Sequence, residues 1–259
     1  MCRWLNIPRS SYYYQAVDPV SEADLEDKIT YIFLESKSRY GARKIKKCLE
    51  KDGIILSRRR IRRIMKRLNL VSVYQKAAFK PHSRGKNEAP IPNRLDRQFD
   101  QKRPLEALVT DLTYVRVDRR WAYVCLTIDF FNREIIGLTV GWHNTAELVK
   151  QAIQSIPYAL TKAKLFHSDR GKEFDNQLID EMLEAFGITR SLSQAGCPYD
   201  NAVAESTYRS FKLEFINQET FQSLKELALK TKDYVHWWNY HRIHGSLNYQ
   251  TPMTKRIIA

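Results

Sequence analysis

Three acidic residues stand in local patterns that could support metal-dependent chemistry. Asp111 lies within the otherwise apolar segment 108–115, Asp169 follows a short strand pattern, and Glu205 falls within a helical pattern. Carboxylates from separate segments can hold Mg²⁺ ions, which require oxygen ligands in near-octahedral geometry. Two such ions roughly 3.5–4 Å apart stabilise the attacking and leaving oxygens of an in-line phosphoryl displacement. The trio therefore predicts phosphodiester chemistry on nucleic acid.

The trio needs two strands and a helix to position it. An ionised carboxylate inside an apolar strand is costly unless it meets positive charge, which makes Asp111 unusual. Asp169 precedes a break at the carboxyl end of a strand, where α/β sheets commonly place active-site groups. On the helix of Glu205, Asn201 lies one turn before and Lys212 two turns after. We expect Lys212 to contact a DNA phosphate and Asn201 to border the site; a surface lysine and a helix cap are the alternatives.

The segments around the trio alternate between strand and helix patterns. Strands are predicted over residues 108–117, 121–129, 133–140, 163–168 and 188–192, and helices over 145–159, 175–186 and 201–217. A last helix is predicted from Thr220 to a point before Pro252. A meander of strands followed by alternating helices and strands predicts a mixed α/β sheet covered by helices.

Other side chains could be mistaken for ligands. Asp129 also stands at a strand end, but we assign it a structural role. We expect His167 to position its loop rather than to bind metal. Three histidines gather near the carboxyl end of the chain, at His236, His241 and His244. No cysteine pair lies near them, so zinc is not predicted. Arg242 is predicted to make polar contacts, to DNA or to the helix of Glu205.

The charge of the chain favours a polyanionic partner. The formal net charge is +14 over 259 residues, and the sequence pI is about 9.6. Residues 1–100 contribute +12 of this charge and residues 101–259 only +2. A basic first part that binds DNA or RNA and a second part that carries out chemistry are therefore expected.

Cysteine usage and hydropathy suit a cytoplasmic protein. The four cysteines (Cys2, Cys48, Cys125 and Cys197) are far apart and form no C-x-x-C pair, which suits a reducing compartment. No apolar run approaches the roughly 18–20 residues that cross a bilayer, and the start lacks a signal-peptide pattern. We therefore expect no membrane association.

The first part of the chain shows three helical patterns. Apolar residues recur at helical spacing from Ser21, again near Ile45, and again after Ser57, which is a plausible N-cap. The other face of the third helix carries seven cations within ten residues: Arg58, Arg59, Arg60, Arg62, Arg63, Lys66 and Arg67. A short turn followed by a strongly basic helix predicts a helix-turn-helix unit that contacts DNA. A merely solvated basic face is the alternative.

We divide the chain into four segments. These are an aromatic N-terminal segment (1–19), a helix-turn-helix DNA-binding domain (20–74), a basic proline-containing linker (75–104) and a catalytic core with a C-terminal helix (105–259). The linker loses hydrophobic periodicity and carries Lys76, Lys80, Arg84 and Lys86. We expect it to be exposed and to lie along phosphates.

Several ordered motifs run through nearly the whole chain. They are Tyr40-Gly41-x-Arg43, Thr110-Asp111-Leu112-Thr113-Tyr114, His167-Ser168-Asp169-Arg170-Gly171, Asp200-Asn201-Ala202-x-x-Glu205-Ser206, Lys212-x-Glu214 and Asn239-x-x-Arg242-x-His244-x-x-Leu247-x-Tyr249-x-x-Pro252. Together they resemble the orf B (second-frame) product of the IS-three family of bacterial insertion-sequence transposases. That family belongs to the Asp-Asp-Glu superfamily, with a ribonuclease-H-like core of the retroviral-integrase type. The chain departs from many relatives at Leu108, at Gln194-Ala195 and at Thr207.

The resemblance implies a function for the acidic trio. Asp111, Asp169 and Glu205 would form the catalytic triad and bind two Mg²⁺ (or Mn²⁺) ions. The reaction would be nicking of DNA at the element ends, followed by attack of the freed 3′-OH on another phosphodiester. The implied partners are DNA, an upstream-frame (orf A) product or fusion, and further copies of the chain assembled on DNA. The implied location is the bacterial cytoplasm, in association with the nucleoid.

Two alternatives remain open at this level. One is a non-catalytic DNA-binding regulator or inhibitor of transposition, although the intact trio argues against it. The other is a ribonuclease-H-like nuclease or resolvase, which would leave the basic helix-turn-helix and the tail motif without a purpose.

Overall fold

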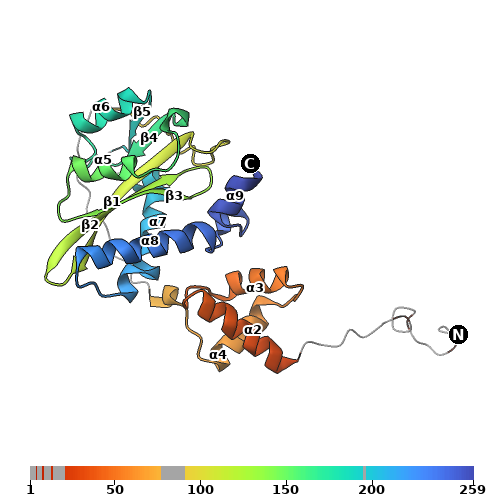
Figure 1. Ribbon diagram of the computed structural model, residues 1–259. Coiled ribbons are helices and arrows are strands. Elements are labelled where there is room, and N and C mark those ends of the chain that lie inside the picture. Colours follow the sequence, from red (N-terminus) through yellow and green to blue (C-terminus); the bar gives the residue numbers. More distant parts are fainter. Residues whose placement is uncertain (1–3, 5–7, 9–12, 14–20, 77–90, 195–196) are drawn as a thin grey trace. The chain divides into compact units, whose positions relative to one another are not determined.

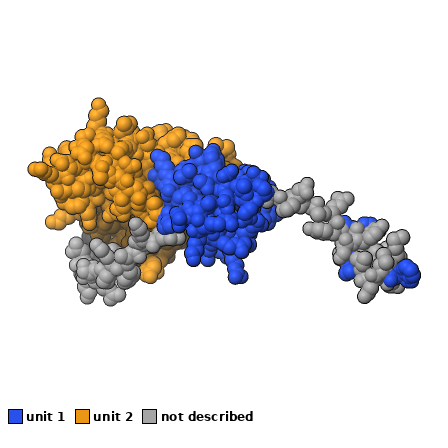
Figure 2. All heavy atoms as spheres, turned by 90° about the horizontal axis from the view of Figure 1, so that it is seen from below, with its two compact units in different colours: residues 1–72 blue, residues 73–259 orange. Residues whose placement is uncertain are grey.

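The computed structural model describes residues 21–76, 91–194 and 197–259, together with the separate positions 4, 8 and 13. The chain divides into two compact units, Met1–Ser72 and Val73–Ala259 (Figure 2). The aromatic segment 1–19 and the linker residues Lys80, Arg84 and Lys86 lie largely or wholly outside the described residues, as does the side chain of Lys76. Among the described residues, no helix is both long enough and apolar enough to cross a membrane.

The first unit contains three helices in its described part. They are α2 (Glu22–Glu35), α3 (Ala42–Lys51) and α4 (Arg58–Arg67) (Figure 1). The Ser57 side chain accepts a hydrogen bond from the N–H of Arg60, which confirms it as the N-cap of α4. Gly53 follows α3 with a φ of 76°, a conformation that glycine adopts without strain. The predicted apolar stripes are buried at Leu25, Ile29, Phe33, Ile45, Leu49, Ile61, Ile64 and Met65.

The second unit is built on a five-stranded mixed sheet. Its strands are β1 (Ala107–Val117), β2 (Arg120–Asp129), β3 (Ile135–Gly141), β4 (Leu165–Ser168) and β5 (Thr189–Leu192). Their order is β3-β2-β1-β4-β5. The first three form an antiparallel meander, and β4 and β5 run parallel to β1. The predicted fold class is confirmed, with β1 at the centre of the sheet.

Helices cover both faces of this sheet (Figure 1). They are α5 (Ala146–Gln154), α6 (Gln177–Ala185), α7 (Ala202–Glu214), α8 (Leu224–Tyr240) and α9 (Pro252–Ile258). Short 3₁₀ helices lie at Val73–Lys76, Leu160–Lys162, Pro198–Asn201, Ile216–Gln218 and Gly245–Leu247. Successive side chains of a strand point to opposite faces. Leu108 accordingly packs with apolar residues of α5 and α6, and Val109 with those of α7 and α8.

The last predicted helix is shorter than expected. It begins at Leu224 and ends at Tyr240, well before Pro252. The chain then turns back, with Asn248 and Tyr249 at φ values of 53° and 61°. Pro252 starts α9 as a first-turn residue, where its missing N–H costs nothing. The helix stops because side chains of the turn pack inward, and this tertiary contact overrides local helix propensity.

Candidate active site

The register of the sheet brings Asp111 and Asp169 together. β1 pairs with β4 only over Ala107–Val109, and the last matched pair is Val109 with His167. Asp111 and Asp169 each lie two residues after that pair, where the two strands have stopped pairing. Since neighbouring strands lie about 4.8 Å apart, equal register places the two carboxylates next to each other. Asp111 shares the face of Val109 and therefore points toward α7, the helix of Glu205.

The electrostatics of Asp111 reflect this crowding. Burial raises its pKa from the usual range to about 7, and the negative charge of Asp169 adds to the rise. The N–H of Leu112, which donates to the carboxylate at 2.7 Å, opposes the shift. Glu205 and Glu173 raise the pKa of Asp111 further. The charges of three other carboxylates therefore act on Asp111 at this point of the sheet.

Asp169 is held by the loop that follows it. Its carboxylate accepts a hydrogen bond from the N–H of Gly171 at 2.9 Å. Burial raises the pKa of Asp169, the Gly171 N–H lowers it, and the charge of Glu173 raises it. A Cβ at Gly171 would lie 2.6–2.8 Å from the carboxylate atoms of Glu173, so the absence of a side chain at Gly171 leaves room for that group.

Glu173 was not among the predicted site residues. The signal was present in the sequence, because Glu173 lies only four residues after Asp169 in the same loop. An acidic residue after a strand is ordinarily solvated, so this spacing alone does not mark Glu173 as part of the site.

Tyr208 fixes the helix of Glu205 to the strand of Asp111. Its hydroxyl donates a hydrogen bond to the carbonyl oxygen of Asp111 and accepts one from the N–H of Leu126 at 2.8 Å. Asp111 and Leu126 are directly opposite each other in the β1–β2 ladder. The hydroxyl thus bridges the two strands at the position of the acidic residue. Glu205 lies three residues earlier on α7 and is exposed.

The donor set suits a hard divalent cation, since each of the clustered groups supplies carboxylate oxygens. Repulsion among them is what a bound cation would relieve. Within the described ranges, however, no three His, Cys, Asp or Glu side chains lie close enough together to hold a metal ion. Electrostatic repulsion acts over longer distances than coordination does. The carboxylates are therefore neighbours that are not in coordination geometry.

Asn201 immediately precedes α7, and Lys212 lies near its carboxyl end, so the two residues stand on either side of Glu205 along the chain. Asn201 is 6 % exposed, and its Oδ1 has no hydrogen-bond partner among the described residues. Its side chain does not cap α7, although Asn201 occupies the N-cap position. Lys212 places its ammonium 4.9 Å from the ring centroid of Tyr114. DNA contacts by Asn201 and Lys212 remain predictions.

Asp129 and His167 have the structural roles that were expected of them. Asp129 is fully buried, accepts hydrogen bonds from the N–H groups of Leu105 and Phe131, and pairs with Arg256 at 2.7 Å. The ring of His167 lies within hydrogen-bond distance of two serine hydroxyls at the β5 end, Ser191 and Ser193. Burial lowers the pKa of His167 to about 4, so the ring is neutral.

Arg242 forms a buried ion pair with the helix of Glu205. The residue is 7 % exposed, and its guanidinium donates to both carboxylate oxygens of Glu214 at 2.8–3.1 Å. Glu214 is itself buried at the end of α7, where a carboxylate needs a cationic partner. Tyr74 and Tyr234 also donate to Glu214. Of the two contacts predicted for Arg242, the one with the helix of Glu205 is therefore observed, and a contact with DNA stays a prediction.

Two of the seven basic residues of α4 are engaged within the first unit. Arg60 pairs with Glu22 at 2.6 Å, and Arg67 pairs with both Glu22 and Glu26. The other five cations are exposed, namely Arg58, Arg59, Arg62, Arg63 and Lys66. DNA contact by these five stays a prediction, whereas Arg60 and Arg67 also tie α4 to α2.

Comparison with known proteins shows which families the chain resembles. Residues 101–198 and 186–252 match family models described as integrase core domains, and residues 20–78 match an HTH-like domain. The chain is 29% identical over 99% of its length to a putative transposase InsK for the insertion sequence IS150 of Escherichia coli (strain K12), of which it covers 92%. It is also 29% identical to the transposase for IS904 of Lactococcus lactis subsp. lactis (strain IL1403), with 88% of this chain and 91% of that protein covered. The chain thus combines an HTH-like domain with an integrase core, and over most of its length it is similar to insertion-sequence transposases.

Solved structures similar to the chain include two integrase catalytic cores. The HTLV-2 integrase catalytic core is 15% identical, with a TM-score of 0.44, and the match covers 60% of this chain and 97% of that chain. The BIV integrase core is 17% identical, with a TM-score of 0.44, and the match covers 60% and 95%.

Proposed function

We propose that the chain is a transposase that nicks DNA at the ends of its insertion sequence and joins the freed 3′-OH to another phosphodiester. Asp111, Asp169 and Glu205 are the catalytic residues and hold two Mg²⁺ (or Mn²⁺) ions. The observation that carries the proposal is the equal register of Asp111 and Asp169 beyond the pair Val109–His167. The influence of Glu205 on the pKa of Asp111 supports its membership of the same site.

The three carboxylates would reach the metal site from different elements of the fold. Asp111 and Asp169 extend from neighbouring strands, and exposed Glu205 reaches the site from α7. Bound ions would supply electrostatic stabilisation of the phosphoryl group and activation of an oxygen nucleophile. Asp111 must lose its proton when it becomes a ligand, so binding at this site releases protons near neutral pH. Water and a 3′-OH are both oxygen nucleophiles, so one set of carboxylates serves both steps.

DNA binding is assigned to two surfaces. In the first unit, the five exposed cations of α4 neutralise phosphates or enter a major groove. In the second unit, Lys212 lies two turns after Glu205 and contacts a phosphate beside the reacting one. Joining requires that two element ends be held together, which favours an assembly of several copies on DNA. The family resemblance adds an upstream-frame product, separate or fused, as a partner.

A joining assay tests this proposal. The full chain, with and without the upstream-frame product, is given Mg²⁺ and DNA that carries the inverted repeats of the element. Asp111→Asn and Glu205→Gln should each lower the rates of nicking and joining at least a hundredfold while leaving the fold intact. Asp233→Asn is the matched control, because Asp233 is an exposed aspartate on α8.

Other outcomes would overturn the proposal. Cleavage of an RNA–DNA hybrid with no joining would assign the chain to the nucleases. DNA binding with no cleavage under any of these conditions would assign it to the regulators. Full joining by the Asp111→Asn variant would remove Asp111 from the site.

A further inference from the structure

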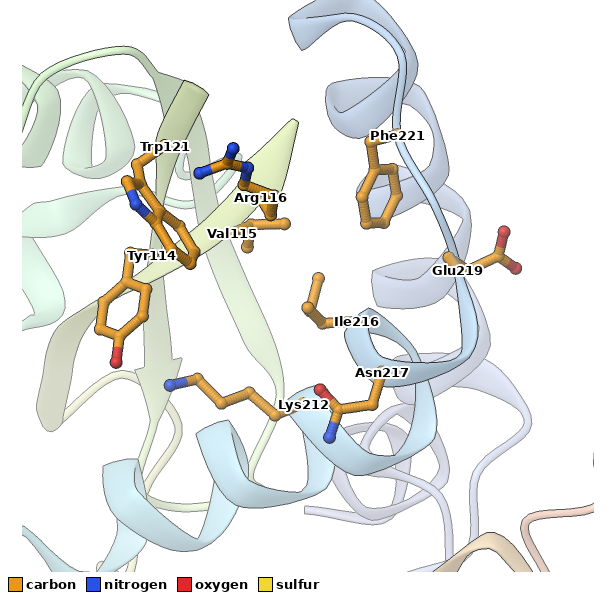
Figure 3. Close-up of a pocket in the computed structure, with 9 residues that line it drawn as sticks. All are labelled: Tyr114, Val115, Arg116, Trp121, Lys212, Ile216, Asn217, Glu219 and Phe221. Carbon is orange, nitrogen blue, oxygen red and sulfur yellow. The ribbon is translucent and has the colours of Figure 1, made fainter. Parts of the chain in front are cut away.

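A pocket opens at the outer end of the β1–β2 hairpin, beside the carboxyl end of α7 (Figure 3). Its volume is about 320 Å³, which lies at the small end of the range for ligand sites. Tyr114, Arg116 and Trp121 line it from the hairpin, and Lys212 and Phe221 from the other side. The mechanism described above assigns no role to the hairpin residues.

Two of the lining residues are large aromatics that the fold leaves open to solvent. Tyr114 is 58% exposed and Trp121 is 50% exposed. Their rings meet edge to face, with centroids 5.1 Å apart. Neither ring is needed to fill either hydrophobic core. Surfaces that bind single-stranded nucleic acid commonly combine cations with exposed aromatic rings, on which the bases stack.

The charge of the pocket is positive. The Lys212 ammonium lies 4.9 Å from the ring centroid of Tyr114, and the Arg116 guanidinium lies 5.3 Å from that of Trp121. Glu219 also lines the pocket, but it is paired with Lys230 at 2.9 Å. Both pocket cations therefore rest on aromatic rings, from which they can turn to a phosphate group when a polyanion arrives.

The pocket lies at a defined distance from the acidic residues. Lys212 is seven residues after Glu205 on α7, which corresponds to about 10 Å along the helix. Tyr114 is three residues after Asp111 on β1, which corresponds to about 10 Å along the strand, and its side chain leaves the opposite face of the strand. Lys212, on the helix that covers the face of Asp111, nevertheless reaches the Tyr114 ring. Successive nucleotides of one strand are about 3.4 Å apart in B-form DNA. A DNA strand that passes from the reacting phosphate around β1 therefore reaches the pocket after about three nucleotides.

We propose that this pocket receives an unpaired base of the DNA strand, about three nucleotides from the reacting phosphate. The base stacks on Tyr114 or Trp121, and Arg116 contacts the adjoining phosphate, while Lys212 holds the strand between the pocket and the reacting phosphate. A paired base is already stacked within the duplex and cannot present its face to the rings, so the strand must be unpaired here. This inference rests on the proposed function, because the distances are counted from the acidic trio.

Photo-crosslinking tests where the DNA lies. 5-Iododeoxyuridine is placed singly at positions one to eight from the reacting phosphate on each strand of inverted-repeat DNA. The full chain is irradiated with each DNA in the presence of Ca²⁺, and the linked residue is identified by mass spectrometry. Cross-links to Tyr114 or Trp121 should be strongest at positions two to four, and should increase when that position is mispaired. Cross-links elsewhere on the second unit, with none to the hairpin, would overturn the proposal.

Substitutions test the energetic role of the rings. Trp121→Leu and Tyr114→Leu should weaken binding of DNA that is mispaired at positions two to four by about tenfold, within the range for loss of one stacked base. Binding of fully paired DNA should change much less. Tyr114→Phe should bind like the unaltered protein, because stacking needs no hydroxyl. Tyr240→Leu is the matched control, since Tyr240 is 50% exposed on α8 and lies outside the pocket.

These outcomes separate the two proposals. If the unaltered protein neither nicks nor joins inverted-repeat DNA, the proposed function fails. If it joins DNA and Trp121→Leu binds mispaired and paired DNA as well as the unaltered protein does, only the pocket assignment fails. Cross-links from the hairpin to a second copy of the chain would assign the pocket to a protein interface and would also overturn the inference.

Discussion

Tyr208 and Asp111 are joined by a hydrogen bond from the phenol hydroxyl to the strand carbonyl, which ties α7 to the centre of the sheet. The same hydroxyl accepts a hydrogen bond from the N–H of Leu126, the residue that faces Asp111 on β2. Burial raises the pKa of Tyr208 well above its usual range, which keeps the hydroxyl protonated and able to donate. The Tyr208 hydroxyl thus adds a polar link between the helix of Glu205 and the strand of Asp111 to the apolar packing of α7 on the sheet.

We expect Tyr208→Phe to loosen this arrangement. The change leaves the Leu126 N–H and the Asp111 carbonyl without their partner, which should cost about 1–3 kcal/mol in the free energy of unfolding. The joining rate should fall by more than the DNA affinity does, because Glu205 loses its anchor. Denaturant unfolding and a joining assay measure the two effects. Tyr123→Phe on β2 is the control, and equal effects of the two variants would contradict the anchoring role.

The Arg242–Glu214 pair predicts a stability defect rather than a DNA-binding defect. Arg242→Met leaves the buried Glu214 carboxylate without its cation, which should cost about 3–5 kcal/mol. Adding Glu214→Gln should recover part of that loss, since the uncompensated charge is gone. Denaturant unfolding measures both variants. Arg209→Met, at an exposed position of α7, is the control; a normal free energy of unfolding combined with weak DNA binding in Arg242→Met would favour the DNA contact instead.

The raised pKa of Asp111 predicts a pH-dependent stability. The folded-state pKa of about 7 lies above the value of about 3.9 for an unfolded chain, so the native protein holds a proton that the unfolded chain releases. The stability contributed by this group is therefore present at low pH and is lost as pH rises from about 4 to 7. Asp111→Asn should raise the Tm above pH 7 in EDTA, and the gain should vanish near pH 4.

Thermal unfolding across this pH range checks the sign. Mg²⁺ should raise the Tm of the unaltered protein above pH 7 and have a smaller effect on Asp111→Asn, because binding to the native state alone stabilises it. Equal melting temperatures for the two proteins at pH 8 in EDTA would contradict the raised pKa.

We expect the arginines of α4 to differ in their effects on DNA binding and on stability. Arg62→Ala and Arg63→Ala should each weaken DNA binding and reduce the slope of log affinity against log salt by about one, if each contacts a phosphate. Arg60→Ala should lower the stability only slightly as well, because it removes an exposed ion pair with Glu22. Binding measured over a salt series tests this, with Lys28→Ala on α2 as the control. Unchanged salt slopes would remove α4 from the DNA interface.

The local patterns of the sequence were sufficient to predict most elements and the segments of the acidic trio. Alternation and helical spacing placed β1, β4 and α7 to within a few residues. The register between Val109 and His167 could not be predicted, because pairing of distant strands depends on tertiary packing. For the same reason, the bridging hydroxyl of Tyr208 was not foreseen. The pairing of Arg242 with Glu214 could not be predicted, because arginines are ordinarily exposed and this buried partner lies 28 residues away.

The Glu173 carboxylate can lie close to the backbone of Gly171 because glycine has no side chain. Because the carboxylate of Glu173 occupies the place that a Cβ would take, an alanine at position 171 would push that flexible group aside rather than break the loop. Asp169 and Asp111 would then feel less negative charge, although no ionisable residue had been altered. A single methyl group could in this way retune the affinity of the neighbouring aspartates for protons and cations.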